Sequence, residues 1–391
     1  MQAEPFEIAV PEEKLEDLRT RLERINWAPD FGNDGWAYGV NGEYLRELAD
    51  HWLNRYDWRA HEAEMNRFNN FRVEIEGMPI HFVHERGKGP NPIPIILSHG
   101  WPWTYWDLRH VIGPLTDPAA HGGDPADSFD VVVPSLPGYG FSTPLTTPGI
   151  NYWRTADLWV TLMREVLGYE RFAAQGGDWG ALVTSQLGHK YAEHLIGIHL
   201  TDAIMLNMFT HDRPWVLGDP GLASMPQGEA RAANLARLRY YSAHVAVQAL
   251  DPQTLAFMAH DSPIGLCAWI LERRRNWGDT NGDVESRFPK DDLLTTMMLY
   301  WATDAFVTSV RYYYEAAWNQ WQPSHDRTPV VEAPTGLTFH GPGAPQEPSE
   351  QQREYWNLVH WDSHPAGGHF APAEEPEAIV RGIRATFREL R

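Results

Sequence analysis

Short apolar runs and helix-like stretches alternate between residues 68 and 205. Strands that alternate with helices predict a mostly parallel sheet with helices on both faces. Reactive groups in such sheets lie in loops after the carboxyl ends of the strands. The expected strands are an alternating hairpin, FRVEIEGMPIHFVHERG, and the runs IPIILSHG, FDVVVPSLPG, RFAAQGGD and GIHLTDAIML.

The pattern differs on both sides of this region. Residues 1–67 indicate an N-terminal arm with a short strand, FEIAV, and two amphipathic helices, PEEKLEDLRTRLERI and EYLRELADHWLNRYDW. Helical stretches dominate residues 206–330, which predicts an inserted helical cap. Residues 331–391 return to a strand, PTGLTFHG, and close with an amphipathic helix, EAIVRGIRATFREL. The core is therefore expected in two parts, 68–205 and 331–391.

Composition excludes several classes of partner. The net charge of −20, from 52 acidic and 32 basic residues, argues against nucleic acid or an anionic membrane surface. No run reaches the roughly 20 apolar residues that span a bilayer, and the first residues lack a signal-peptide layout. The single cysteine, Cys267, lies in an apolar stretch and suits an inert thiol in a reducing cytoplasm. No metal-ligand spacing or phosphate loop indicates a cofactor.

One motif in the core predicts chemistry. The run RFAAQGGD leads through Gly176-Gly177-Asp178-Trp179-Gly180 into the helix-like stretch ALVTSQLGHKYAEHL. The spacing is that of the G-x-S-x-G nucleophile elbow, with an aspartate at the serine position. A carboxylate there attacks saturated carbon and forms an ester that must then be hydrolysed. A serine would instead indicate acyl transfer.

Two further segments supply the expected partners of this nucleophile. His99-Gly100-Trp101-Pro102 follows the strand IPIILS, so the backbone N–H groups of Trp101 and Trp179 can form an oxyanion hole. The Trp101-Pro102 bond is a candidate cis peptide. His369 follows two glycines and precedes the final helix, which is the place of the catalytic base in the nucleophile-acid-histidine order of α/β-hydrolases.

The motifs HGWPWTYWDL, PSLPGYGFS, GGDWGALVTSQLG, DSPIGLCAWILE and GGHFAPAEEPE resemble those of epoxide hydrolases in the α/β-hydrolase superfamily. The N-terminal arm makes the chain more similar to the microsomal-type branch, without that branch's membrane anchor. The resemblance covers nearly the whole chain. It implies an α/β-hydrolase fold with a cap, ester formation by Asp178 at an epoxide carbon, and hydrolysis by water that His369 activates.

The acid that orients the histidine departs from the family pattern. Relatives place it some 26 residues before the histidine, where this chain has Gly343 in a loop without a nearby well-held carboxylate. Glu347 and Glu350 are close in sequence, but the loop around them is rich in proline and glycine. Some haloalkane dehalogenases place the acid after the strand that follows the nucleophile helix. Asp202 occupies that position here, so we expect it to orient His369. Glu347 is the alternative acid, and the structural alternative is that Asp202 only caps the entry to the cap domain.

Family members use two cap tyrosines as donors to the epoxide oxygen. Tyr313 matches one of them, while the other position holds His244. Tyr241 and Tyr240 lie three and four residues before His244, so either can share its helix face. The indole N–H of Trp179 is a further donor beside the nucleophile. Aromatic packing is the ordinary alternative for all of these side chains.

The substrate is expected to be a bulky or aromatic epoxide, with water as the second reactant. His99, Trp103, Tyr240 and His244 are candidate substrate contacts. Further aromatic residues suggest a large apolar site: Trp106, Trp269, Trp277 and Tyr312. Secondary-metabolite biosynthesis and detoxification both fit, and the oligomeric state stays open, a homodimer included.

Two other functions share these motifs. A haloalkane dehalogenase would use the same aspartate, acid and histidine, with indole donors around the halide. A ligand-binding relative that has lost catalytic activity would explain why no well-held carboxylate stands some 26 residues before His369.

Overall fold

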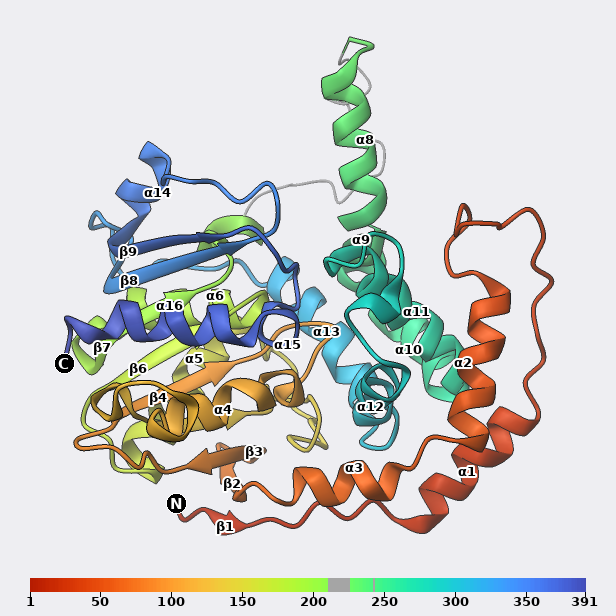
Figure 1. Cartoon of the computed structure of the whole chain (residues 1–391), viewed down its shortest axis with the longest axis horizontal. Coiled ribbons are helices and arrows are strands. Elements are labelled where there is room, and N and C mark those ends of the chain that lie inside the picture. Colours follow the sequence, from red (N-terminus) through yellow and green to blue (C-terminus); the bar gives the residue numbers. More distant parts are fainter. Residues whose placement is uncertain (210–225, 242) are drawn as a thin grey trace.

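The computed structural model describes residues 1–209, 226–241 and 243–391, except the side chains of 236–241. Nine strands of the described residues form one sheet in the order β1-β2-β3-β5-β4-β6-β7-β8-β9 (Figure 1). Their bounds are β1 Glu4–Pro5, β2 Asn70–Ile75, β3 Met78–Glu85, β4 Ile93–Ser98, β5 Phe129–Pro134, β6 Phe172–Gly176, β7 Leu195–Leu200, β8 Val331–His340 and β9 Trp356–His364.

The strands from β5 to β9 in this order run parallel, and β1, β2 and β3 add an antiparallel edge. The mostly parallel sheet predicted from the alternating pattern is therefore confirmed. The β2–β3 turn is made by Glu76 and Gly77, both with positive φ. Two details differ from the prediction. β7 ends at Leu200 rather than continuing through GIHLTDAIML, and β9 has a mixed polar pattern that gave no strand signal.

Helices cover both faces of the sheet, as the alternation predicts. α4 (Arg109–Thr116) and α16 (Pro376–Arg388) pack on one face. α5 (Tyr152–Val160) and α6 (Trp179–Lys190) pack on the other. The remaining short elements of the core are η1 Tyr105–Leu108, η2 Ala119–His121, η3 Pro125–Asp127, η4 Thr161–Val166, η5 Ala192–His194, η6 Leu206–Phe209, α14 Glu350–Tyr355 and α15 Ala371–Glu374.

A group of helices lies between β7 and β8 in the sequence and sits beyond one end of the parallel strands (Figure 1). Its elements are α8 Glu229–Tyr241, α9 Ala243–Leu250, α10 Pro252–Asp261, α11 Pro263–Trp277, η7 Val284–Ser286, α12 Lys290–Trp301 and α13 Ala305–Trp318. The stretch DDLLTTMMLYWATDAFVTSVRYYYEAAW reads as one helix but forms α12 and α13, because Asp304 takes a left-handed conformation with φ 56°.

No single helix of the described residues is long and apolar enough to cross a bilayer. Only α10 and α11 taken together meet the length and composition requirement, and they bend by 119° at the break between them.

The N-terminal arm joins the sheet to the cap. β1 pairs with β2, and α1 (Glu12–Glu23), α2 (Gly42–Asn54) and α3 (Trp58–Met65) run from the sheet edge to the cap helices (Figure 1). The arm buries apolar side chains along this path, such as Leu18, Leu48 and Trp52. Exposed ion pairs such as Arg21 with Asp261 add little to this packing.

A buried ion pair links the cap to the loop after β4. The Arg274 guanidinium on α11 lies 2.7 Å from the Asp107 carboxylate on η1, and both side chains are almost fully buried. Asp107 also accepts the backbone N–H of Thr104. The Arg274 guanidinium lies 4.1 Å from the ring of Phe370, next to His369. This pair therefore holds the cap against two loops that carry candidate site residues.

Removing one partner of that pair should destabilise the protein. Arg274→Met leaves the Asp107 carboxylate buried without its counter-charge, so the free energy of unfolding should fall by about 3 to 5 kcal/mol. Adding Asp107→Asn removes the stranded charge and should recover part of the loss. Urea unfolding of both variants at one pH measures the difference. A single variant within about 1 kcal/mol of wild type, the usual range for exposed pairs, would contradict this account.

Candidate active site

Asp178 sits on a sharp turn between β6 and α6, with φ 52° and ψ −124°. A non-glycine residue at positive φ is strained and is retained when the surroundings hold it. Two glycines make the turn sterically accessible. A Cβ on Gly176 would lie 2.1 Å from the Gly180 carbonyl oxygen, and a Cβ on Gly180 would lie 2.0 Å from the Ser98 carbonyl oxygen. The elbow predicted from G-x-D-x-G spacing is thus present.

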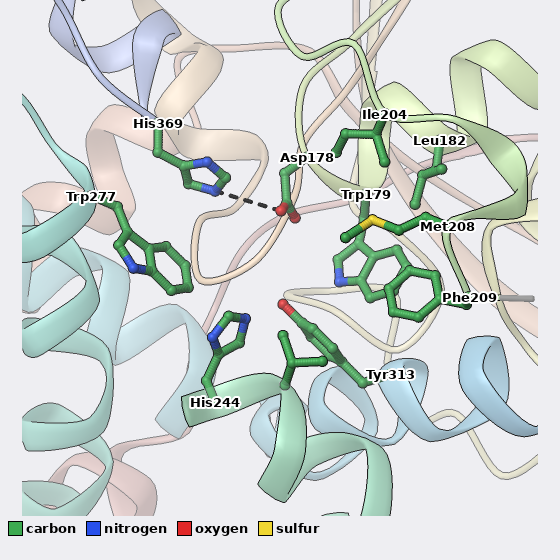
Figure 2. Close-up of a pocket in the computed structure, with 11 residues that line it drawn as sticks. Asp178, Trp179, Leu182, Ile204, Met208, Phe209, His244, Trp277, Tyr313 and His369 are labelled. Carbon is green, nitrogen blue, oxygen red and sulfur yellow. Dashed lines mark ion pairs between the residues drawn. The ribbon is translucent and has the colours of Figure 1, made fainter. Parts of the chain in front are cut away.

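The two carboxylate oxygens of Asp178 face different groups. The backbone N–H of Trp101 donates to Oδ1 at 2.7 Å, and the N–H of Trp179 also hydrogen-bonds the carboxylate. Oδ2 lies 3.5 Å from His369 Nε2 (Figure 2). The backbone groups expected to form an oxyanion hole therefore both interact with the carboxylate of Asp178. The Trp101-Pro102 peptide is cis.

Electrostatics at Asp178 follow from its enclosure. Burial raises the pKa of Asp178 to about 6, while the positive charge of His369 and the two backbone N–H donors oppose this shift. The nearby Asp202 carboxylate raises the pKa further by like-charge repulsion. A carboxylate destabilised in this way is a stronger base than an exposed one, which is typical of functional sites.

His369 is held by its backbone and by aromatic neighbours. Its N–H donates to the Trp277 carbonyl at 2.9 Å, and its ring contacts the edges of the Trp277, Trp103 and Phe370 rings. A Cβ on Gly368 would lie 2.5 Å from the Trp277 carbonyl oxygen, so only glycine permits this close approach. The glycines before His369 thus let its loop pack against α11.

The expected pairing of Asp202 with His369 is not formed. Asp202 Oδ2 accepts the backbone N–H of Asp178 at 2.8 Å instead. The reason is topological: β7 is the neighbour of β6, so the residues just past its end lie against the elbow. The alternatives fail too, because Glu347 and Glu350 are exposed. Within the described part of the chain, Asp178 is the only carboxylate paired with His369.

Tyr313 and His244 lie on the opposite side of the cavity from the Asp178 carboxylate (Figure 2). Tyr313, on α13, is 3% exposed and packs edge-on against the rings of Trp101, Trp179 and His244. His244, on α9, stacks on Trp101 with ring centroids 5.3 Å apart. Both candidate donors therefore line the same cavity as Asp178.

The other candidate donors have different outcomes. Trp179 lines the cavity, and its buried indole lies against the Tyr313 side chain. Tyr240 and Tyr241 end α8, and their side chains lie outside the described residues.

The proposed substrate contacts His99 and Trp103 do not line the cavity, and that prediction is corrected. The His99 Nδ1–H donates to the Gly100 carbonyl, and Nε2 accepts the N–H of Leu136 at 3.0 Å. Burial lowers the pKa of His99 to about 4, so the ring is a neutral structural link. Trp103 is fully buried behind Gly100, where a Cβ would lie 2.5 Å from its Nε1.

The cavity has a volume of about 160 Å³. Sequence reasoning missed several apolar lining residues because they follow β7 in a run read as strand or lie within helices: Leu182, Ile204, Met208, Phe209 and Val245. Of the additional aromatic candidates, only Trp277 lines the cavity. Trp106 and Tyr312 are buried elsewhere, and Trp269 donates to Gln248.

No group of histidine, cysteine, aspartate and glutamate side chains suited to a metal ion occurs in residues 1–209, 226–241 and 243–391. Cys267 is fully buried, and burial raises its pKa to about 12, as expected for an inert thiol.

Neutralising Asp178 should stabilise the fold. The pKa of Asp178 is about 6 when folded against an ordinary 3.8. The folded state therefore keeps a proton that the unfolded state has lost between pH ~4 and ~6, and stability falls as pH rises through this window. Asp178→Asn should raise the free energy of unfolding by about 2 to 3 kcal/mol at pH ~7.5 and by little near pH ~4. Thermal unfolding across pH measures this, with the exposed Asp34→Asn as control. Equal effects at both pH values would contradict it.

Comparisons with known proteins agree with this geometry. A family described as "Epoxide hydrolase N terminus" matches residues 3–108, and a family described as "alpha/beta hydrolase fold" matches residues 93–336. The chain is 33% identical over 397 residues to "Epoxide hydrolase 1" of Oryctolagus cuniculus, which covers 97% of this chain and 87% of the relative.

Two solved structures superpose over the whole chain. The juvenile hormone epoxide hydrolase of the silkworm Bombyx mori has a TM-score of 0.80 at 28% identity and is covered to 94% of its length. The Aspergillus niger epoxide hydrolase has a TM-score of 0.80 at 26% identity and is covered to 97%. Together with the aspartate elbow, these matches show that the chain belongs to the epoxide hydrolase family of the α/β-hydrolase superfamily.

Proposed function

We propose that the protein opens an epoxide to a vicinal diol through a covalent ester on Asp178. The observation that carries this proposal is that the two carboxylate oxygens of Asp178 have different partners. The Trp101 N–H donates to Oδ1, while Oδ2 faces the cavity and His369. Oδ2 attacks an epoxide carbon, the carbon–oxygen bond breaks, and its electron pair leaves on oxygen. Tyr313 donates to that oxygen and protonates it.

Hydrolysis of the ester regenerates the carboxylate. His369 takes a proton from a water molecule, which adds to Cγ of the Asp178 ester. The negative charge that develops on Oδ1 is stabilised by the N–H groups of Trp101 and Trp179. The intermediate collapses as the Cγ–Oδ2 bond breaks, and the leaving diol oxygen takes the proton of the hydroxyl that was added. The proton held by His369 returns to the tyrosinate of Tyr313. The sum is one epoxide and one water converted to one diol.

Asp202 has a positioning role in this scheme. Its carboxylate satisfies the Asp178 N–H at the strained turn, which supports the elbow rather than the histidine. An unsatisfied buried N–H would cost about 1 to 3 kcal/mol.

The cavity favours a compact apolar epoxide. Its volume of about 160 Å³ is close to that of a site known to hold one benzene ring, and its walls away from the reacting groups are apolar. We therefore propose an epoxide with one aromatic ring or an alkyl group of similar size. This narrows the bulky substrate expected from the aromatic content.

Trapping the ester tests the reaction. His369→Gln should form the ester with styrene oxide but fail to hydrolyse it, so intact mass should rise by one substrate and the labelled peptide should contain Asp178. Asp178→Asn, mixed under the same conditions, should show no added mass. Release of bromide from bromoalkanes without turnover of any epoxide would instead indicate a haloalkane dehalogenase. Full turnover by Asp178→Asn would exclude the covalent scheme.

The role of Asp202 is tested separately. Asp202→Asn keeps an acceptor for the Asp178 N–H, so both ester formation and ester hydrolysis should stay within about fivefold of wild type. Asp202→Ala leaves that N–H unsatisfied and should slow ester formation by roughly 10- to 100-fold. If Asp202→Asn slows ester hydrolysis alone by orders of magnitude, as loss of a histidine-orienting acid does, then Asp202 acts on His369 instead.

A further inference from the structure

We propose that the neutral imidazole of His244 is the second donor to the epoxide oxygen, acting together with Tyr313. The inference rests on the proposed epoxide opening and assigns a catalytic role to a residue whose ordinary alternative is aromatic packing. Its evidence is the position of His244 across the cavity from Asp178 and a ring nitrogen that points into the cavity (Figure 2).

The direction of attack decides where the epoxide oxygen must lie. A carboxylate displaces the oxygen from the face opposite the breaking bond, so the departing oxygen points away from Asp178. Figure 2 shows the Tyr313 hydroxyl and one ring nitrogen of His244 pointing to the same part of the cavity, opposite the Asp178 carboxylate. These two groups meet where negative charge develops, which is where donors lower a barrier most.

Packing holds the His244 ring in one orientation. It lies parallel to Trp101, with an interplanar angle of 6°, and contacts Trp277 at a centroid distance of 4.6 Å. Its ring is perpendicular to that of Tyr313, with centroids 5.4 Å apart. A donor fixed in this way costs little reorganisation when the oxygen leaves. The ring that it stacks on belongs to Trp101, whose N–H holds the nucleophile.

An unsatisfied polar atom at this depth needs an explanation. His244 is 7% exposed, and its Nδ1 is buried without a hydrogen-bond partner. Buried polar groups in native structures are nearly always paired, and each exception calls for an explanation. Because Nδ1 has no acceptor, the single N–H of the neutral ring is better placed on the other nitrogen, which points into the cavity, where a bound epoxide oxygen would accept it.

The charges around His244 keep it neutral. Burial lowers its pKa well below the usual value, and the positive charges of Arg273 and His369 add to this effect. Tyr313 is the other titratable group in contact, and burial and the Asp178 carboxylate raise its pKa well above the usual value. His244 therefore donates a hydrogen bond without transferring its proton. Tyr313 supplies the proton, and the His244 N–H stabilises first the alkoxide and then the tyrosinate.

Three substitutions separate donation from packing. His244→Phe keeps an aromatic ring over Trp101 but has no donor, so the rate constant of ester formation in single turnovers with styrene oxide should fall roughly 10- to 100-fold. Ester hydrolysis should change less than threefold. His244→Tyr and His244→Gln restore a donor with and without an aromatic ring, and should recover most of the rate that His244→Phe loses. His260→Phe, on the exposed side of α10, is the matched control.

The leaving oxygen provides a second readout. Trifluoromethyl oxirane gives a less basic alkoxide than methyl oxirane, so the rate of its opening depends less on hydrogen-bond donors to the leaving oxygen. The loss caused by His244→Phe should be several-fold smaller for the trifluoromethyl substrate. A loss of the same size for both substrates, or ester formation within threefold of wild type in His244→Phe, would overturn the assignment. Wild type that forms no ester at all would defeat the proposed function itself, independently of His244.

Discussion

Burying the Asp178 carboxylate at a residue with positive φ costs free energy, and contacts from the neighbouring segments compensate part of this cost. The Asp202 carboxylate accepts a hydrogen bond from the Asp178 backbone N–H, and the Trp101 N–H donates to the Asp178 carboxylate. Glycines at Gly176 and Gly180 provide the space that the turn requires. The raised pKa of Asp178 shows that these contacts compensate the burial only in part, which leaves a reactive carboxylate.

The cavity has polar side chains at its two ends and apolar side chains between them. His369 and Asp178 lie at one end, and Tyr313 and His244 lie at the other. Aromatic rings fix the orientation of these groups, since Trp101 contacts His244 and Tyr313 while Trp277 contacts His244 and His369. The cap contributes Tyr313 and His244 and the core contributes Asp178, so the placement of the cap sets the distance between the two ends of the cavity. The buried Arg274–Asp107 pair is one of the contacts that set this placement.

The elements predicted well are those with a local signal. β6, α6 and the turn between them follow from a short apolar run, two glycines and a long helical pattern. β9 was missed because its polar and apolar residues do not alternate cleanly. The break at Asp304 was missed because residues on both sides of it have helical patterns, and only the structure shows that the exposed Asp304 takes a left-handed conformation.

The sequence by itself determined the aspartate elbow, the Trp101 N–H that hydrogen-bonds its carboxylate, and the class of fold, because each depends on residues close together in the chain. Only the tertiary structure decided that Asp202 serves the Asp178 amide, that His99 and Trp103 are structural, and that His244 faces Tyr313. These outcomes depend on strand order and on the direction of side chains from segments far apart. Spacing along the chain places a residue at the edge of a sheet, but the neighbouring strands and helices determine which group it meets.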